Sequence, residues 1–274
     1  MEPCRPSGSR ARAETGKAIA MIRAGRERRR STASAVLPIR NSVLAALLAA
    51  GCNGVLPKLE HVMLRSGQTL YRAEQNIEDV YFPEEAVVAM IDSTDDGRTV
   101  EVGIIGREGI VGLNVFLGGV TTPDKAVVQL AGGATRMRAQ DLRNELRFGI
   151  PLQQLLLSYA RTFLAVISQS VACSQHHDIE QRLARLLLTL DDYAGSREFS
   201  MPQASIAPLL GVRRAGVSVA AHTLQAQRLI AYRRGRICVL ERLGLERKSC
   251  ECYRFIRRQY ATFRAVLPRL LPRS

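Results

Sequence analysis

The sequence lacks several features that would assign a function at once. It has no apolar run near the ~18 residues needed to span a bilayer. It also has no nucleotide-binding P-loop, no GxSxG, no HExxH and no CxxC pair. These absences argue against a membrane-spanning protein and against the enzyme classes that such motifs mark. We therefore expect a chain without enzyme activity and without catalytic residues.

Cysteine is also sparse, with six residues in 274, at Cys4, Cys52, Cys173, Cys238, Cys250 and Cys252. A chain of this length can bury a core without a disulfide framework. One residue separates Cys250 from Cys252, which is too close for the common zinc knuckles. We interpret the six as free thiols in a reducing compartment and expect no metal site, with a redox or iron–sulfur role as the alternative.

Positive charge is in excess, with 39 Lys and Arg against 25 Asp and Glu and a net charge of +14. Residues 1–40 carry +7, residues 41–194 carry −5 and residues 195–274 carry +12. The excess points to an anionic partner, either nucleic acid or a membrane surface. The change of sign along the chain indicates domains with different partners.

The first 40 residues have no apolar periodicity, and we predict a disordered basic arm there, with Met21 as an alternative initiator. An apolar run at 43–50 then precedes Gly51-Cys52, as in a lipoprotein signal. However, Ala49 stands where such signals usually carry leucine, and the charged leader is about twice too long. We favour an amphipathic helix that opens the first domain.

Short strands and glycine-containing turns alternate between His61 and Arg138. The predicted strands are residues 62–64, 79–82, 86–91, 99–105 and 126–130, and the predicted turns include Ser66-Gly67, Asp95-Asp96-Gly97 and Gly132-Gly133. This pattern is typical of an antiparallel roll or barrel.

A long helix is predicted from Pro151 to about residue 175. Its apolar stripe consists of Leu152, Leu155, Tyr159, Phe163, Val166 and Ser170. The other side is also rather apolar, with Leu156, Leu157, Ala160 and Ala165. A parallel coiled-coil dimer would cover that side, and burial within the monomer is the alternative.

A second helix is predicted at 179–190, after the junction His176-His177-Asp178. Adjacent residues on a helix point about 100° apart and cannot share one ion well. We therefore interpret the junction histidines as hydrogen-bonded rather than metal-bound.

The most specific pattern follows Ser200, a candidate N-cap. A helix-turn-helix needs a small residue where its helices cross, a glycine at the turn and an apolar residue in the second helix, and Ala207, Gly211 and Val217 have the required spacing. Its core would consist of Ile206, Leu210, Val217, Ala221 and Leu224. Pro208 departs from the pattern, because proline removes a backbone hydrogen bond.

The second helix of this motif, from about 213 to 227, would present Arg213, Arg214, Ser218 and His222 outward, where they can contact bases and phosphates. Residues 229–240 have the pattern strand, glycine turn, strand. This is the wing of a winged helix, with Arg233, Arg234 and Arg236 near its tip to contact phosphate. The alternative is a small helical bundle with a basic solvated face.

This order of parts resembles the cAMP receptor protein/fumarate-nitrate regulator (Crp/Fnr) superfamily over roughly residues 41–246. The likeness is carried by the helix-turn-helix and by the stretch from Gly67 through Asp96-Gly97-Arg98 to Gly106, Gly109 and Gly112. The resemblance implies an α+β fold: an N-terminal antiparallel, cyclic-nucleotide-binding-like β-roll, a long dimerisation helix and a C-terminal winged helix-turn-helix. It also implies a homodimeric, effector-controlled transcription regulator that bends promoter DNA.

The predicted domains are a disordered basic arm (1–40), an effector domain (41–150), a dimerisation helix (151–178), the winged helix-turn-helix (179–246) and a basic C-terminal helix (247–274). The last helix has Tyr253, Ile256, Tyr260 and Phe263 at helical spacing. We expect it to pack beside the winged helix.

The departures from the family concern its ligands. Cyclic-nucleotide binders of the superfamily hold the ribose with a Glu after the glycine turn, but Leu113 and Asn114 follow Gly112 here. The phosphate-holding arginine is missing, and Lys125 is the nearest cation, without a bidentate fork. The resemblance leaves Gly109, Gly112, Leu113 and Lys125 as a degenerate effector pocket. We expect weak or absent cAMP binding, no other cofactor, and no iron–sulfur cluster, because the N-terminal cysteine cluster of the oxygen-sensing branch is missing.

In the recognition helix, Arg214 matches a family arginine, but Ala215 and Val219 replace the usual Glu and Arg, so the operator should differ from TGTGA. We predict a cytoplasmic homodimer that binds double-stranded DNA, with RNA polymerase as a further candidate partner and no membrane partner. An effector-independent regulator with a degenerate sensor is the main alternative. A lipoprotein tethered through Cys52 and an enzyme are less favoured.

Overall fold

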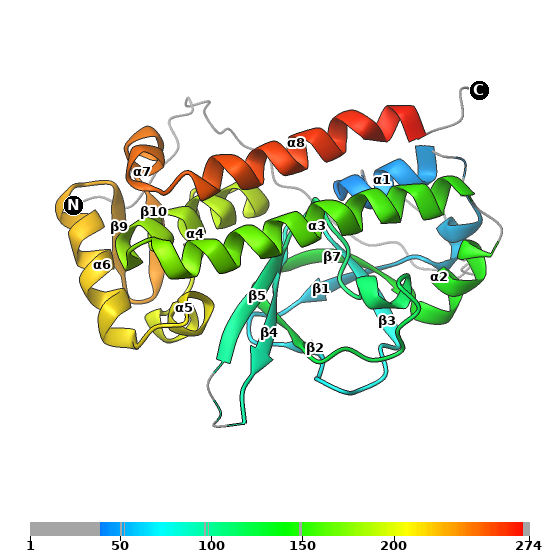
Figure 1. Cartoon of the computed structure of the whole chain (residues 1–274), viewed down its shortest axis with the longest axis horizontal. Helices are drawn as coiled ribbons and strands as arrows, with labels where there is room; N and C mark the ends of the chain where they lie inside the picture. The colour runs from blue at the N-terminus through cyan, green and yellow to red at the C-terminus, as the bar shows by residue number, and fades with distance from the viewer. Residues whose placement is uncertain are drawn as a thin grey trace, which may run out of the picture. The chain divides into compact units, whose positions relative to one another are not determined.

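The protein is described by a computed structural model over residues 39–270, apart from Ala50, Cys52, Asp96, Arg98 and residues 148–149. The predicted basic arm therefore lies outside the described residues, except for its last two positions, as do the lipoprotein cysteine and the centre of the predicted hairpin. The described part has the predicted α+β fold, with antiparallel sheets, a long helix and a C-terminal helix-turn-helix (Figure 1).

Two antiparallel sheets form the roll. One has the order β1 (Glu60–Leu64), β7 (Gly132–Arg138), β3 (Asp79–Pro83), and the other has the order β2 (Thr69–Tyr71), β6 (Lys125–Leu130), β4 (Val87–Ser93), β5 (Thr99–Ile105). Shorter helical segments flank the strands: α1 (Ser42–Ala49), η1 (Asn53–Lys58), η2 (Leu113–Val115) and α2 (Ala139–Leu146). The five predicted strands are present, whereas β2, β7 and α2 were not predicted.

The predicted turn at Gly132-Gly133 is wrong, because these residues open strand β7 and pair with Leu64 and Met63 of β1. A Cβ atom on Gly132 would lie 2.5 Å from the backbone nitrogen of Ala86. Glycine is needed here so that two chain segments can approach closely, not so that the chain can reverse.

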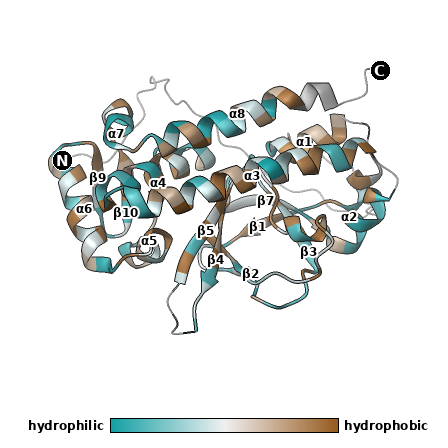
Figure 2. Ribbon diagram, in the orientation of Figure 1, coloured by the Kyte–Doolittle hydropathy of each residue, from teal (hydrophilic) through white to brown (hydrophobic). Residues whose placement is uncertain are grey.

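Helix α3 (Ile150–His176) is the predicted long helix, and Figure 2 shows hydrophobic residues along much of it. The predicted stripe from Leu152 to Val166 is buried, and Ser170 is half-buried. A Cβ atom on Gly109 would lie 2.1 Å from the Tyr159 hydroxyl, and one on Gly103 would lie 2.8 Å from the Phe163 ring. The two glycines thus let α3 lie close against the roll.

The other side of α3 only partly matches the sequence prediction. Leu156 and Ala160 are buried within the chain, and Ala160 lines a cavity between α3 and the roll. Helices α1 and α8 (Cys252–Leu270) also pack against α3. Leu157 is exposed, as expected. Among the described residues, α3 is long and apolar enough to cross a membrane by length and composition alone, which corrects our expectation that no segment qualifies. Core helices of soluble proteins pass the same test.

The C-terminal part begins with α4 (Ile179–Ala194), whose capping box joins Asp178 and Gln181. It continues with β8 (Glu198–Ser200), α5 (Gln203–Leu210), α6 (Arg214–Ala226), β9 (Ile230–Arg233), β10 (Arg236–Val239) and α7 (Arg242–Lys248). Strands β8, β10 and β9 form one antiparallel sheet in that order. The prediction that Ser200 caps a helix is wrong: it lies in β8 opposite Arg236, and Pro202 is the N-cap of α5.

Helix α8 was expected to pack beside the winged helix, and its first turn does so, since the Tyr253 hydroxyl donates to the Asp192 carboxylate of α4 at 2.8 Å. Farther along, Phe263 packs on Tyr159 of α3, with ring centroids 5.8 Å apart. Figure 1 shows α8 running alongside α3. The C-terminal helix therefore packs against the long helix α3 as well as against the winged helix.

Candidate nucleic-acid interface

The helix-turn-helix has the predicted geometry. Gly211 ends α5 in the left-handed conformation, with φ of 59°, which glycine adopts without strain. Ala207 and Val217 are buried where the two helices meet. All five predicted core residues are buried, with exposed fractions of 3% or less: Ile206, Leu210, Val217, Ala221 and Leu224. Pro208 lies in the second turn of α5 and does not end the helix.

The N-terminus of α6 carries two exposed arginines. Arg213 is the N-cap and Arg214 the first helical residue, and no acidic residue lies in the first turn. The free N–H groups and the dipole make this end of a helix positive, so two cations there are unfavourable for the isolated helix, by about 0.3–1 kcal/mol each. The same arrangement favours an anion such as a phosphate.

The outer face of α6 has both polar and apolar residues. His222 and Ala215 are exposed, and Val219 has an exposed fraction of 69%. An exposed branched apolar side chain on this face can contact a thymine methyl group. Ser218 is only half-buried, and its hydroxyl donates to Gln203 Oε1 of α5 at 2.6 Å. Its predicted outward orientation is thus only partly right, because α5 already uses its proton.

The wing is a tight hairpin between β9 and β10. Its two turn residues, Arg234 and Gly235, both have positive φ, at 50° and 79°, as in a type I′ turn. An arginine in this conformation is strained, and such strain is common at functional sites. Arg233 and Arg234 are exposed, whereas Arg236 forms an ion pair with Glu198 of β8, with 2.9 Å between its Nε and Oε1.

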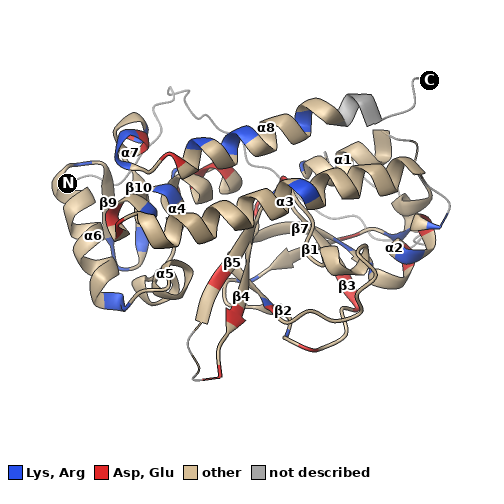
Figure 3. Cartoon of the chain, in the orientation of Figure 1, with Lys and Arg blue, Asp and Glu red and all other residues tan. Residues whose placement is uncertain are grey.

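A groove of about 450 Å³ separates α6 from the wing. It is lined by Arg214, Ser218, His222 and Gln225 of α6, by Tyr232, Arg234 and Gly235 of the wing, and by Pro202, Gln203 and Ala221. The structure thus brings four of the predicted residues to one groove, and places Arg213, Arg233 and Arg236 outside its lining. Figure 3 shows basic residues where α6 follows α5.

Tyr232 forms part of the wall of this groove and links the wing to the segment that precedes α5. Its hydroxyl donates to the Met201 carbonyl at 2.8 Å. Burial raises the pKa of Tyr232 to about 12, although the nearby Arg214 lowers it. The phenol therefore stays protonated at neutral pH and holds the wing in place. Gln203, Tyr232 and Val219 were not predicted as site residues, although the i, i+4 spacing of Val219 from Ala215 indicated that it shares the exposed face.

The predicted effector residues divide into two groups. Gly112 and Leu113 line a cavity of about 140 Å³ between the roll and α3, together with Tyr71, Asp124 and Phe163 among others. Gly109 lies outside its lining, beneath Tyr159, and Lys125 also does not line it.

This cavity is unsuited to a phosphate. It contains Asp124, whose Oδ1 accepts a hydrogen bond from the Thr122 hydroxyl at 2.6 Å. The buried Oδ2 of Asp124 has no hydrogen-bond partner among the described residues. The described lining has no Lys or Arg, and the volume is below the roughly 300 Å³ at which small-molecule pockets begin.

The described part thus combines a winged helix-turn-helix, with a basic groove, with a long helix and a β-roll of the cyclic-nucleotide-binding-like type. Residues 181–248 match the family model of the Crp-like helix-turn-helix domain. The chain has the fold of the Crp/Fnr regulators, as the sequence resemblance implied, and the solved structures that match it include several of that family.

The matching structures are similar in fold and distant in sequence. FixK2 from Bradyrhizobium japonicum is 17% identical, with a TM-score of 0.61, over 70% of this chain and 98% of that one. TTHB099, a CRP-family transcriptional regulator from Thermus thermophilus, is 19% identical, with a TM-score of 0.58, over 69% and 96%.

The c-di-GMP-responsive global regulator CLP from Xanthomonas campestris is 15% identical, with a TM-score of 0.54, over 72% of this chain and 98% of that one. No functionally curated protein matches the chain. TTHB099 is described as a transcriptional regulator and CLP as a global regulator of gene expression.

Proposed function

We propose that this chain is a sequence-specific DNA-binding transcription regulator of the Crp/Fnr type. The observation that carries the proposal is the groove in which Arg214 and His222 of α6 face Arg234 of the wing. Helix α6 would enter the major groove, where Arg214 reads a base, and the wing would contact the neighbouring phosphates.

The regulator acts as a homodimer formed through α3. Ile150, Leu157, Leu164 and Val171 are exposed, by 56–69%, and recur every seven residues along this helix. A seven-residue apolar repeat is typical of the seam between two coiled helices. A dimer would present two copies of α6 to a near-palindromic operator, whose half-sites are about 34 Å apart.

An effector of unidentified chemistry controls the regulator through the roll. The start of β5 is close to the helix-turn-helix, since a Cβ atom on Gly211 would lie 3.8 Å from Val100. An effector would act by favouring one of two arrangements of the winged helices. The small cavity, with the buried Oδ2 atom of Asp124, argues against cAMP as this effector. The alternative function is a regulator that needs no effector.

We place this regulator in the cytoplasm, with double-stranded DNA as its partner and RNA polymerase as a further partner at the promoter. CLP is described as c-di-GMP-responsive, so a protein of this fold can respond to a dianionic nucleotide. For this chain, a thermal-shift screen of cyclic nucleotides and metabolites identifies an effector by the rise in melting temperature that a specific ligand produces.

The experiment that tests the proposed function is a gel-shift titration of the full chain over a salt series. One duplex covers the region upstream of the chain's own gene, and a random duplex of equal length is the control. We expect the promoter duplex to retain binding at salt concentrations that abolish binding to the control, because phosphate contacts alone are lost steeply with salt. Equal affinity for both duplexes at every salt concentration would contradict the proposal.

A further inference from the structure

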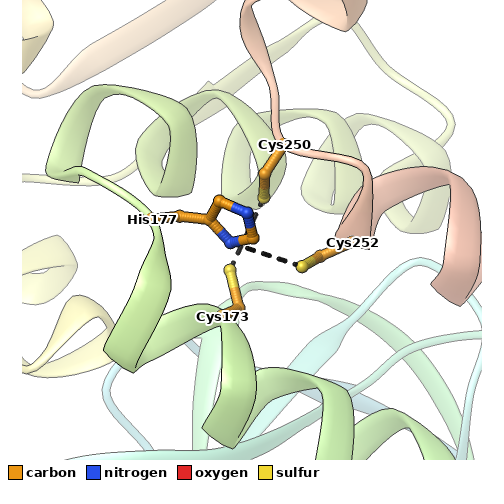
Figure 4. A group of neighbouring side chains, drawn as sticks. All are labelled: Cys173, His177, Cys250 and Cys252. Atoms are coloured by element: carbon orange, nitrogen blue, oxygen red, sulfur yellow. Dashed lines mark hydrogen bonds between the residues drawn. The ribbon is translucent and has the colours of Figure 1, made fainter.

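Three cysteines and a histidine, distant in sequence, lie together where α3 ends and α8 begins (Figure 4). Cys173 belongs to the last turn of α3, His177 directly follows that helix, and Cys250 and Cys252 flank Glu251 at the start of α8. Their four potential ligand atoms all lie within 4.8 Å of one another.

The distances within this cluster match a single tetrahedral metal ion. Cys173 Sγ is 3.5 Å from Cys250 Sγ, and Cys252 Sγ is 3.6 Å from His177 Nδ1. Ligands about 2.3 Å from a tetrahedral zinc ion are separated by about 3.8 Å. An iron–sulfur cluster distributes its four protein ligands over two or four irons, which would hold some of the ligand atoms farther apart than the 4.8 Å found here.

The groups around the cluster are those that orient metal ligands. His177 directs Nδ1 toward the sulfurs, and its other ring nitrogen, Nε2, is 3.2 Å from the Glu251 carboxylate. A carboxylate on the second nitrogen fixes the tautomer and raises the basicity of a metal-binding histidine. Gln169 Nε2 donates to Cys252 Sγ at 3.0 Å, which suits a thiolate.

The cysteines of the cluster are shielded from solvent, and two arginines lie near enough to balance the negative charge of a zinc–thiolate site. The three cysteines are at most 3% exposed. Three thiolates and one Zn²⁺ carry a net charge of −1, and Arg182 and Arg185 of α4 interact electrostatically with Cys173. The Nε atoms of both arginines are buried without a hydrogen-bond partner among the described residues.

We propose that Cys173, His177, Cys250 and Cys252 bind one Zn²⁺ ion in a structural site. Three sulfurs and one nitrogen are a donor set that selects zinc, and four protein ligands leave no open position for catalysis. The three thiols lose their protons to solvent when the ion binds. The ion would fasten the start of α8 to the junction between α3 and α4, and so join the long helix to the winged helix.

This site was not expected from the sequence, because the neighbouring cysteines and the neighbouring histidines were each considered as separate pairs. Cys250 and Cys252 are too close together for a knuckle, and His176 and His177 point in different directions. The informative spacing is Cys173 to His177, one helical turn apart on one face. The two pairs meet only because α8 returns along α3.

The test begins with the full-length chain, purified without a histidine tag from cells grown with added zinc, and with its metal content measured by mass spectrometry. We expect about one zinc per chain. Replacement by Co²⁺ should give the visible absorption of a tetrahedral, thiolate-rich site. A chain that contains no zinc and does not take up Co²⁺ after reduction, or that contains iron with acid-labile sulfide, would overturn the proposal.

Matched variants locate the ion without depending on a buried substitution. Glu251→Gln, at an exposed side chain, should weaken zinc affinity by roughly 10- to 100-fold in a competition titration with a chelating dye. His177→Gln should change the cobalt spectrum, whereas His176→Gln, at the adjacent exposed residue, should not. An unchanged spectrum and affinity in both His177→Gln and Glu251→Gln would contradict the assignment.

The role of the ion is tested on the unmodified chain. Removal of the metal by a strong chelator should lower the melting temperature by more than about 4 °C, and added zinc should restore it. A melting temperature that does not respond to metal removal would contradict a structural role. None of these measurements depends on DNA binding, so they can fail or succeed independently of the proposed function.

Discussion

At the residue scale, the arginines in and near the groove between α6 and the wing differ in their surroundings. Arg214 lies at the start of α6, beside the exposed Val219 face. Arg234 lies at the tip of the wing in a left-handed backbone conformation. Arg236 is already paired with Glu198. These surroundings predict a different consequence for each arginine when it is removed.

Arg214→Ala should cost about 1–3 kcal/mol of DNA-binding free energy and relax the preference at one operator position, because a base contact is lost. Competition binding against a panel of single-base operator variants measures both effects. Arg213→Ala is the matched control, since Arg213 is the neighbouring arginine outside the groove lining. If Arg214→Ala weakens all sequences equally and Arg213→Ala changes the preference, the roles assigned to the two residues are reversed.

Arg234→Ala should weaken binding to all sequences alike and reduce the slope of log K against log salt by about one, because one phosphate contact is lost. Fluorescence anisotropy at several salt concentrations gives this slope. Arg236→Ala should change it less, because Glu198 already compensates that charge. A change in sequence preference in Arg234→Ala would argue that the wing reads bases.

Gly109→Ala should destabilise the fold by about 1–3 kcal/mol, because the added methyl group would overlap the Tyr159 hydroxyl. Urea unfolding measures the loss. The double variant with Tyr159→Phe should recover part of it, since the hydroxyl is the nearest clashing atom. Equal stability of Gly109→Ala and the wild type would show that α3 does not press on the roll as described.

At the element scale, the fold of one chain leaves a second row of apolar residues on α3 exposed: Ile150, Leu157, Leu164 and Val171. Leu157→Glu with Leu164→Glu should shift the chain from dimer to monomer, because two charges would enter the seam. Sedimentation velocity measures the change. The control variant places the same two charges at Ala261 and Thr262, exposed positions on α8, and should remain dimeric. A monomeric wild type, or a dimeric double variant, would contradict a dimer through α3.

The helices and strands that were predicted correctly are those whose sequence pattern is imposed by local geometry. The spacing of Ala207, Gly211 and Val217 sufficed to predict the helix-turn-helix, because the turn and the helix crossing impose it locally. Strand β7 was read as a turn, because its opening glycines serve a close approach to Ala86 that no local pattern shows. Leu156 was placed on the outside of α3 but is buried, because the elements that pack against α3 come from distant parts of the sequence.

At the scale of the whole molecule, the order of the domains along the chain could be predicted from the sequence. The contacts between residues that are distant in sequence could not. The charge division and the spacing of residues predicted a basic C-terminal helix-turn-helix, and the fold contains it. The sequence showed that the phosphate-binding arginine is missing, but not that Asp124 lines the cavity. The groove between α6 and the wing and the cluster around Cys173 depend on long-range contacts, so their complete residue sets emerge only from the folded chain.

The central claim is that two copies of the chain read an operator through α6. Selection of binding sites from a pool of duplex DNA with a randomised segment tests it most directly, with the full chain and no assumed promoter. We expect enrichment of two inverted half-sites whose centres are one helical turn, about 10 base pairs, apart or a multiple of that distance. Recovery of no preferred sequence, or of an unpaired half-site alone, would contradict the account.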